Sequence, residues 1–163
     1  MSTTNLSLAL PADACSVASA ACPDDHFYGR TVLLVDDDDS VLSLLGETIA
    51  AMGHKVIVAH DGPQALRCLL RHRSIDCLFT DVVMPNGMTG MQLMTAARAV
   101  RPGLPAVIAS AYPREDVCAM GDIPEDVNFI AKPYLLTDLY PLLDGVKAPK
   151  KVRASRSKES LLF

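Results

Sequence analysis

The sequence predicts an α/β domain with a doubly wound sheet of five parallel strands and five flanking helices. Three observations carry this prediction. Short apolar runs without polar alternation recur along the chain, as in strands that are covered on both faces. Segments with apolar residues at helical spacing separate these runs. Capping and turn-forming residues stand where one kind of segment gives way to the other.

The predicted strands are apolar runs bounded by polar or turn-forming residues. In order, they are residues 31–35, 55–59, 75–80, 106–110 and 128–131. The first reads Thr-Val-Leu-Leu-Val and ends abruptly at four consecutive aspartates. Since parallel strands joined by right-handed crossovers all run the same way, we expect their carboxyl ends to meet at one edge of the sheet.

Two helices are predicted after the first two strands. Residues 41–52 carry apolar residues at helical spacing, and Asp39 or Ser40 can cap this helix. Asp61 can cap the second helix, with Pro63 in its first turn. The residues of the second helix that we expect to face inward are Leu66, Leu69 and Leu70.

Three further helices follow the later strands. The third ends at about Val100, before an Arg-Pro-Gly sequence. The fourth is short and weakly patterned, over residues 115–120, and the last covers residues 139–146. If Asp138 caps the last helix, Pro141 falls at its third position, where no backbone donor is needed.

The two ends of the chain have a different composition. Residues 1–29 are rich in Ser, Ala, Thr and Pro and predict a flexible extension, while residues 148–163 predict a flexible basic tail; the domain itself spans residues 30–147. Nine Lys or Arg and eighteen acidic residues precede Lys147, so that part has a net charge of −9. The residues from Lys147 onward carry +5, which gives −4 for the chain. An acidic body with a short basic tail is not typical of a DNA-binding domain.

The cysteines and the hydropathy indicate a cytoplasmic protein. Five cysteines without a CxxC pair predict reduced thiols rather than a disulfide framework or a zinc site. No Lys or Arg precedes Arg30, so the N-terminus lacks the basic region of a signal peptide and the arginines of a transit peptide. No apolar run approaches the length of a membrane span.

Polar side chains follow the predicted strands where each one ends. Asp36 and Asp37 follow the first strand, Asp81 the third, Ser110 closes the fourth and Lys132 follows the fifth. Three adjacent carboxylates repel one another, and a hard divalent cation such as Mg²⁺ removes that repulsion. One carboxylate could then attack phosphorus to give an aspartyl phosphate, with the ammonium and hydroxyl stabilising the charge. The pattern therefore indicates phosphoryl transfer.

Four motifs in this order resemble bacterial response-regulator receiver domains. They are Val35-Asp36-Asp37, Thr80-Asp81-Val82-Val83-Met84-Pro85, Ser110-Ala111 and Lys132-Pro133, within a resemblance that covers about residues 30–146. The resemblance implies a flavodoxin-like sheet with strand order 2-1-3-4-5 and a phosphorelay function. The loop 85–90 is about one residue longer than in the simplest family members.

The resemblance also assigns roles to individual residues. Asp81 would be the phosphoacceptor, and Lys132 would pair with the phosphate. Mg²⁺ would be held by Asp37 directly, by Asp36 through water, by Asp81 and by the backbone carbonyl of Val83. Ser110 and Phe129 would form a switch pair, with Ser and Phe where the family often has Thr and Tyr. Apart from the resemblance, Val83 and Tyr112 lie two positions beyond Asp81 and Ser110. We expect their bulk to shield the phosphoryl group from water and to slow its loss.

The resemblance further implies the partners. A histidine kinase or a histidine phosphotransfer protein would donate the phosphoryl group. Since too few residues follow residue 146 for an output domain, we expect the signal to leave through a protein bound on roughly residues 115–146, or through a homodimer formed on phosphorylation. We expect no direct DNA or membrane contact, and no enzymatic activity beyond the chain's own phosphorylation and slow dephosphorylation.

Two alternatives remain at this stage. The sequence from Asp37 to Val41 fits the Asp-x-Asp-x-Val pattern of haloacid-dehalogenase-type phosphatases, although Ser40 replaces the usual glycine and no cap domain fits. The second alternative is a receiver-shaped interaction module that no longer uses phosphate. Dependence of labelling on Asp81 or on Asp37 distinguishes a receiver from a phosphatase.

Overall fold

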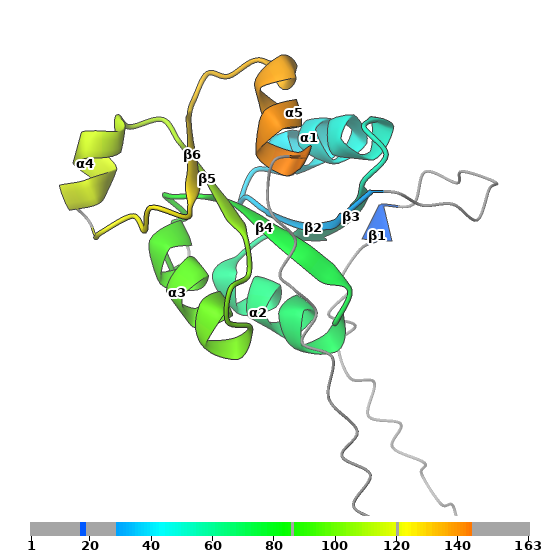
Figure 1. Ribbon diagram of the computed structural model, residues 1–163, viewed down its shortest axis with the longest axis horizontal. Coiled ribbons are helices and arrows are strands. Elements are labelled where there is room, and N and C mark those ends of the chain that lie inside the picture. The colour runs from blue at the N-terminus through cyan, green and yellow to red at the C-terminus, as the bar shows by residue number, and fades with distance from the viewer. Residues whose placement is uncertain (1–16, 19–28, 86, 120, 145–163) are drawn as a thin grey trace, which may run out of the picture.

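One mixed sheet organises the molecule (Figure 1). The computed structural model describes residues 17–18, 29–85, 87–119 and 121–144. In these ranges the strand order is β1-β3-β2-β4-β5-β6. The strands are β1 Val17–Ala18, β2 Thr31–Val35, β3 Lys55–Ala59, β4 Ile75–Asp81, β5 Ala106–Ser110 and β6 Asn128–Ala131.

The strands from β2 to β6 are parallel and confirm the predicted fold. Their spatial order, β3-β2-β4-β5-β6, is the order 2-1-3-4-5 when the first of them is counted as one. The structure adds β1, which pairs antiparallel with β3 through Val17 and Ala18. These two residues lie in the segment that the sequence predicts to be a flexible extension. They supply backbone partners to the outer edge of β3, which would otherwise end the sheet.

Five helices cover the two faces of the sheet. They are α1 Asp39–Ala51, α2 Gly62–Arg71, α3 Gly90–Val100, α4 Arg114–Ala119 and α5 Leu136–Asp144. Figure 1 shows α1 and α5 on one face and α2 and α3 on the other, with the short α4 standing out beside the β6 edge. This two-layer cover explains why the strands are continuous apolar runs, since both faces of the central strands are buried.

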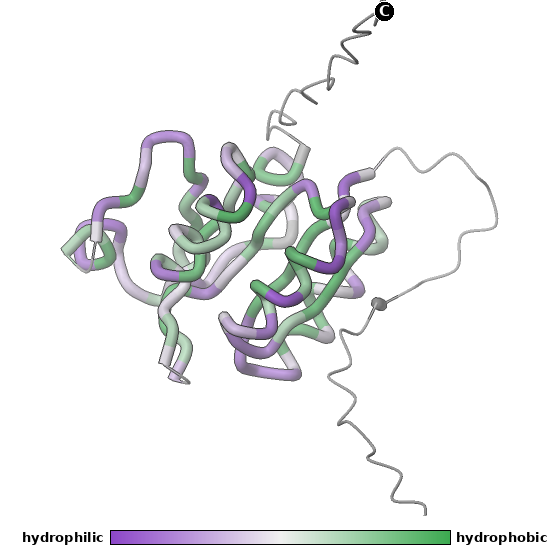
Figure 2. Tube along the Cα trace, turned by 90° about the horizontal axis from the view of Figure 1, so that it is seen from below, coloured by the Kyte–Doolittle hydropathy of each residue, from purple (hydrophilic) through white to green (hydrophobic). Residues whose placement is uncertain are grey.

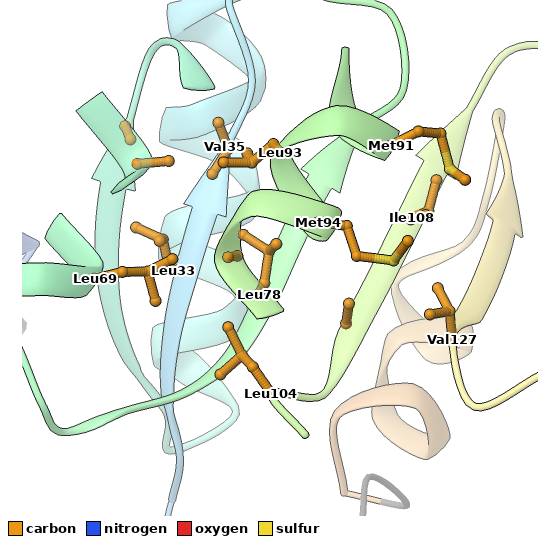
Figure 3. Close-up of a cluster of buried hydrophobic side chains, with 14 of the residues drawn as sticks. Leu33, Val35, Leu69, Leu78, Met91, Leu93, Met94, Leu104, Ile108 and Val127 are labelled. Atoms are coloured by element: carbon orange, nitrogen blue, oxygen red, sulfur yellow. The ribbon is translucent and has the colours of Figure 1, made fainter. Parts of the chain in front are cut away.

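Each face of the sheet carries its own hydrophobic core. On the α2–α3 face, side chains such as Leu33, Leu78 and Ile108 pack against Leu69, Leu93 and the two methionines of α3, as Figure 3 shows. On the α1–α5 face the core includes the following residues: Val32, Leu34, Phe79, Ile49 and Leu139. Neighbouring strand residues alternate between the two cores, as the pleat requires. Figure 2 shows hydrophobic residues concentrated along the inner strands.

The beginnings of α1 and α2 test the predicted caps. Asp38, not Asp39 or Ser40, caps α1, because its carboxylate accepts the Ser40 N–H at 2.8 Å. Asp61 caps α2 as predicted, accepting the Gln64 N–H at 2.6 Å.

One prediction about the buried face of α2 is wrong. Leu69 is buried and Leu66 is partly buried against the core, but Leu70 is 66% exposed. Successive residues of a helix are rotated by about 100°, so Leu69 and Leu70 cannot both face the sheet.

The last helix begins earlier than the sequence predicts. Since α5 starts at Leu136, Asp138 lies in its first turn instead of capping it, and its carboxylate reaches back to accept the Leu135 N–H at 2.9 Å. Pro141 therefore lies at the sixth helical position and not at the third. It removes one helical hydrogen bond, because proline has no N–H to donate to the Thr137 carbonyl.

Among the described residues, one cysteine differs from the prediction of reduced thiols. Cys68 is disulfide-bonded, whereas Cys77 and Cys118 are free thiols. The prediction of reduced cysteines is therefore wrong for Cys68, because spacing along the chain does not reveal which sulfur atoms the fold brings together. The argument for a reducing compartment does not hold for this residue. Within the described ranges, no helix combines the length and apolar character needed to cross a membrane.

Candidate functional site

Three carboxylates meet at the carboxyl edge of the sheet. Asp36 and Asp37 directly follow β2, and Asp81 is the last residue of β4. These strands are parallel neighbours in which Val35 lies opposite Thr80, so the residues that follow come side by side. One carboxylate oxygen from each residue lies within 4.8 Å of the others. The predicted acidic cluster is therefore present.

The three carboxylates differ in their surroundings. Asp36 is buried, Asp81 is partly buried and Asp37 is exposed. Backbone donors fix two of them: Asp36 Oδ1 accepts the Asp38 N–H at 3.0 Å, and Asp81 Oδ1 accepts the Val82 N–H at 2.8 Å. The other oxygens of Asp36 and Asp81 are left for the contact with Lys132.

Lys132 follows the edge strand β6 and reaches the cluster across β5. Its Nζ lies 3.2 Å from Asp36 Oδ2 and 3.3 Å from Asp81 Oδ2, although β6 is separated from β4 by β5. The Lys132 N–H donates to the Ser110 carbonyl at 2.6 Å, which anchors the start of its side chain. The long side chain then spans the remaining distance to the aspartates.

The charges of the site perturb one another. Burial raises the pKa of Asp81, and the Lys132 ammonium opposes this rise without cancelling it. Burial alone would lower the pKa of Lys132, but the carboxylates of Asp36 and Asp81 raise it above its ordinary value. Three carboxylates and one ammonium give the site a formal charge of two negative units. An all-oxygen donor set with this charge suits a hard divalent cation such as Mg²⁺.

The predicted switch residues lie on β5 and β6, the two strands that follow β4 in the sheet. Ser110, at the end of β5, is fully buried, and its Oγ accepts the Tyr112 N–H at 3.0 Å. Phe129 on β6 is partly buried against the core of the α2–α3 face, with the Arg114 guanidinium 6.0 Å from its ring centroid. Phe129 lies opposite Ile108, which is part of the same core, and Ser110 lies two residues beyond Ile108 on the same strand. The side chains of Ser110 and Phe129 therefore point to the same face of the sheet.

The residues predicted to shield the site lie in its surrounding loops. Val83 is 45% exposed and Tyr112 is 48% exposed. Each lies two residues beyond a residue at the carboxyl edge, Asp81 or Ser110. Both side chains therefore present apolar surface to solvent at the edge where the carboxylates lie.

Two residues of the site, Gly90 and Tyr134, were not predicted from the sequence. A Cβ on Gly90 would lie 2.0 Å from the Asp81 carbonyl oxygen, so only glycine lets α3 approach the backbone of that residue so closely. Tyr134 packs edge-on against Phe79 at 6.4 Å; burial raises its pKa, and the charges of Lys132, Asp36 and Asp81 also act on it. The sequence could have indicated that Tyr134 lies near the site, because it is only two residues after Lys132.

The phosphatase alternative finds no support in the geometry. An Asp-x-Asp motif would require Asp37 and Asp39 to share one site. Instead, Asp39 Oδ1 lies 2.9 Å from His60 Nδ1, and the carboxylate is 85% exposed. Among the described residues, Asp39 is absent from the cluster that contains Asp37.

Comparisons with known proteins agree with this arrangement. The profile of the response regulator receiver domain family matches residues 32–144. The transcriptional regulatory protein GlrR of Escherichia coli K12 is 35% identical over 121 residues, which cover 69% of this chain and 25% of GlrR. PrrA of Mycobacterium tuberculosis is 30% identical over 130 residues, 80% of this chain and 55% of PrrA. The chain thus spans about a quarter to a half of the length of these relatives.

Solved structures show the same fold. The chemotaxis protein CheY4 of Vibrio cholerae superposes with a TM-score of 0.66 at 27% identity, covering 72% of this chain and 98% of that one. The receiver domain of the hybrid histidine kinase CckA gives a TM-score of 0.59 at 28% identity, covering 71% of this chain and 97% of that one.

Proposed function

The chain belongs to the response regulator receiver domain family of two-component systems, and on this premise we propose that it accepts a phosphoryl group on Asp81 and signals through the resulting change of its surface. The observation that carries the proposal is the position of Lys132. Its ammonium lies within 3.3 Å of both Asp36 and Asp81, which come from other strands. An acidic cluster alone is common on protein surfaces, but a cation shared between a buried aspartate and a strand-terminal one is suited to phosphoryl transfer.

The chemistry rests on Asp81 as nucleophile. A carboxylate oxygen forms a bond to phosphorus while the bond from phosphorus to the imidazole nitrogen of a donor phosphohistidine breaks, and the departing imidazole takes up a proton. The Val82 N–H orients the attacking carboxylate. Lys132 stabilises the charge on the transferred group, and because its pKa is raised it remains an ammonium at neutral pH.

The same site fits Mg²⁺. We propose Asp37 as a direct ligand together with Asp81 and the Val83 backbone carbonyl, and Asp36 as a contributor through water. When bound, the cation supplies positive charge that neutralises the carboxylates and the incoming phosphoryl oxygens. Asp36 in addition holds Lys132 in place through their 3.2 Å contact.

Phosphorylation would be transmitted through Ser110 and Phe129. The Ser110 hydroxyl is a donor that can turn toward a phosphoryl oxygen on Asp81, giving up its present contact with the Tyr112 N–H. Movement of this hydroxyl and of the loop after β5 frees space on the face toward which Phe129 points, and the partly buried ring turns inward to fill it. Val83 and Tyr112 hinder water at the acyl phosphate and make its hydrolysis slow.

The input and output partners follow from this mechanism. The donor is a histidine kinase or a histidine phosphotransfer protein. The output partner, or a second copy of the chain, binds the surface formed by α4, β6 and α5. That surface presents large apolar side chains to solvent, with Leu135 70% exposed and Tyr140 50% exposed.

Labelling of the full chain with radioactive acetyl phosphate tests the proposal. We expect label to accumulate with Mg²⁺, to be lost when EDTA is added beforehand, and to be absent from Asp81→Asn. The matched control is Asp39→Asn, which alters an exposed carboxylate outside the cluster and should label like the parent protein. Labelling of Asp81→Asn at the parental rate would contradict the proposal. Dependence of labelling on Asp37 as the covalent site would favour the phosphatase, and an unlabelled parent protein would favour the phosphate-independent module.

A further inference from the structure

A groove lies far from the phosphorylation site, between the C-terminal ends of α2 and α3. Figure 1 shows these helices side by side on one face of the sheet. The groove has a volume of about 440 Å³ and is lined by Leu69, Leu70, Arg73, Val100 and Arg101. Because α2 leads into β4 and α3 into β5, the groove lies near the amino edge of the sheet, opposite the carboxylates.

The walls of this α2–α3 groove are apolar and open to solvent. Leu70 is 66% exposed and Val100 is 46% exposed, while Leu69 is buried and forms part of the hydrophobic core. Single exposed apolar residues are ordinary on a protein surface, but two that face a shared hollow form a site for an apolar side chain.

Two arginines give the same groove a positive charge. Arg101 is fixed in place, because Nη1 donates to the Ile75 carbonyl at 2.6 Å and Nη2 donates to the Leu69 carbonyl at 2.7 Å. Arg73 is exposed and forms no hydrogen bond or ion pair with the residues that the structure describes. Burial lowers the pKa of Arg101; the Asp76 carboxylate opposes this, and the neighbouring Arg73 charge adds to it. None of the lining residues is acidic, so the groove itself offers the two guanidinium groups no carboxylate.

Basic residues are few in the body of this chain, and several of them gather near the groove. Only nine basic residues precede Lys147, against eighteen acidic ones. Four of the nine are on α2 or directly follow α2 or α3: Arg67, Arg71, Arg73 and Arg101. A body of net charge −9 thus carries a local cationic region around an apolar hollow.

We propose that the α2–α3 groove binds an acidic segment of a partner protein in which a large apolar side chain stands between carboxylates. The apolar side chain would pack on Leu70 and Val100, and a carboxylate would pair with the planar guanidinium of Arg73, whose donors suit bidentate binding. Nucleic acid and anionic membranes fit less well, because both need an extended positive surface and the rest of the body is acidic. This surface is separate from the phosphoacceptor site, so the inference does not depend on the proposed function.

Selection from a phage-displayed library of random short peptides tests the inference on the full chain. The parent protein is the target, and Arg73→Glu is used for counterselection. We expect enriched peptides to carry Asp or Glu beside a large apolar residue and to lose at least about tenfold in affinity on Arg73→Glu and on Leu70→Ser. Arg71→Glu is the matched control, since it reverses an exposed charge two residues before Arg73, at the end of α2, that does not line the groove. It should change the affinity by less than about twofold.

Several results would overturn the inference. One is the absence of enriched peptides, and another is enrichment of peptides without acidic residues. Equal losses on Arg71→Glu and Arg73→Glu would indicate unspecific attraction. Binding of duplex DNA or of phosphatidylglycerol vesicles that depends on Arg73, without acidic peptides being selected, would assign the groove to a different class of ligand. Circular dichroism of each variant establishes that the fold is retained, and unchanged acetyl phosphate labelling separates this test from that of the phosphoacceptor site.

Discussion

Replacing Gly90 by alanine tests how tightly α3 holds the proposed phosphoacceptor. The added Cβ would lie 2.0 Å from the Asp81 carbonyl oxygen and 2.9 Å from its carbonyl carbon. Cβ atoms do not approach such atoms closer than 3.0 Å, so the backbone of Asp81 and the start of α3 must separate by about 1 Å. Both contacts are with backbone, and no flexible side chain can relieve them.

We expect this displacement to affect both stability and phosphorylation. Overpacking of this kind typically costs about 1–3 kcal/mol, which exceeds the roughly 0.5–1 kcal/mol that alanine gains over glycine in a helix. Gly90→Ala should therefore lower the free energy of unfolding by about 1–2 kcal/mol. Displacing a reacting group by about 1 Å can cost on the order of 100-fold in rate, so labelling by acetyl phosphate should slow strongly.

Urea denaturation followed by circular dichroism measures the first effect, and the rate of labelling measures the second. The matched control is Gly46→Ala in α1, where the nearest atom to the new Cβ is Val56 Cγ1 at 4.0 Å. With space available, this change should stabilise the protein by about 0.5–1 kcal/mol and leave labelling unchanged. The reasoning fails if Gly90→Ala is as stable as the parent and is labelled at the same rate.

The remaining predictions concern charge, shielding and burial. Lys132→Ala should slow acetyl phosphate labelling by about 10²–10³-fold with the fold intact; a parental rate would exclude it as the stabilising cation. Tyr112→Ala should shorten the lifetime of the label severalfold, and an unchanged decay rate would count against its shielding role. Burial raises the pKa of Cys77 to about 12, so Cys77 should resist iodoacetamide in the native protein while exposed Cys118 reacts; peptide mapping showing the reverse order would refute this. A hydrogen bond from Arg98 lowers the pKa of Asp126 below its ordinary 3.8. The ion pair between these residues therefore stabilises the fold above pH 3.8, and this stabilisation is lost as the pH falls through the lowered pKa. Asp126→Asn should cost at most about 1 kcal/mol at pH 7 and nothing once the carboxyl is protonated, and a loss that persists in acid would contradict the electrostatic account.

The fold could be predicted because its signals are local. A strand buried on both faces must be a continuous apolar run, and the run 31–35 shows this directly. The acidic cluster followed from topology, since parallel strands deliver the residues after Val35 and Thr80 to one edge. No additional knowledge of packing was needed for either step.

The features that the sequence did not predict depend on tertiary contacts. Strand β1 has only two residues, which no periodicity can reveal, and it exists through its pairing with β3. Spacing alone does not fix the phase of α2 to within one residue, so Leu70 was placed on the wrong side. The early start of α5 depends on the Asp138 carboxylate reaching back to Leu135, and the disulfide of Cys68 depends on proximity in space.

The covalent site is tested most directly by borohydride reduction of the acetyl phosphate-treated protein, followed by peptide mass mapping. Reduction converts an aspartyl phosphate to homoserine and so marks the residue that held the phosphoryl group. Our account predicts homoserine at position 81 only, in samples treated with Mg²⁺ and not in samples treated with EDTA. Homoserine at position 37, or an unmodified Asp81 in a protein that has incorporated label, would contradict it.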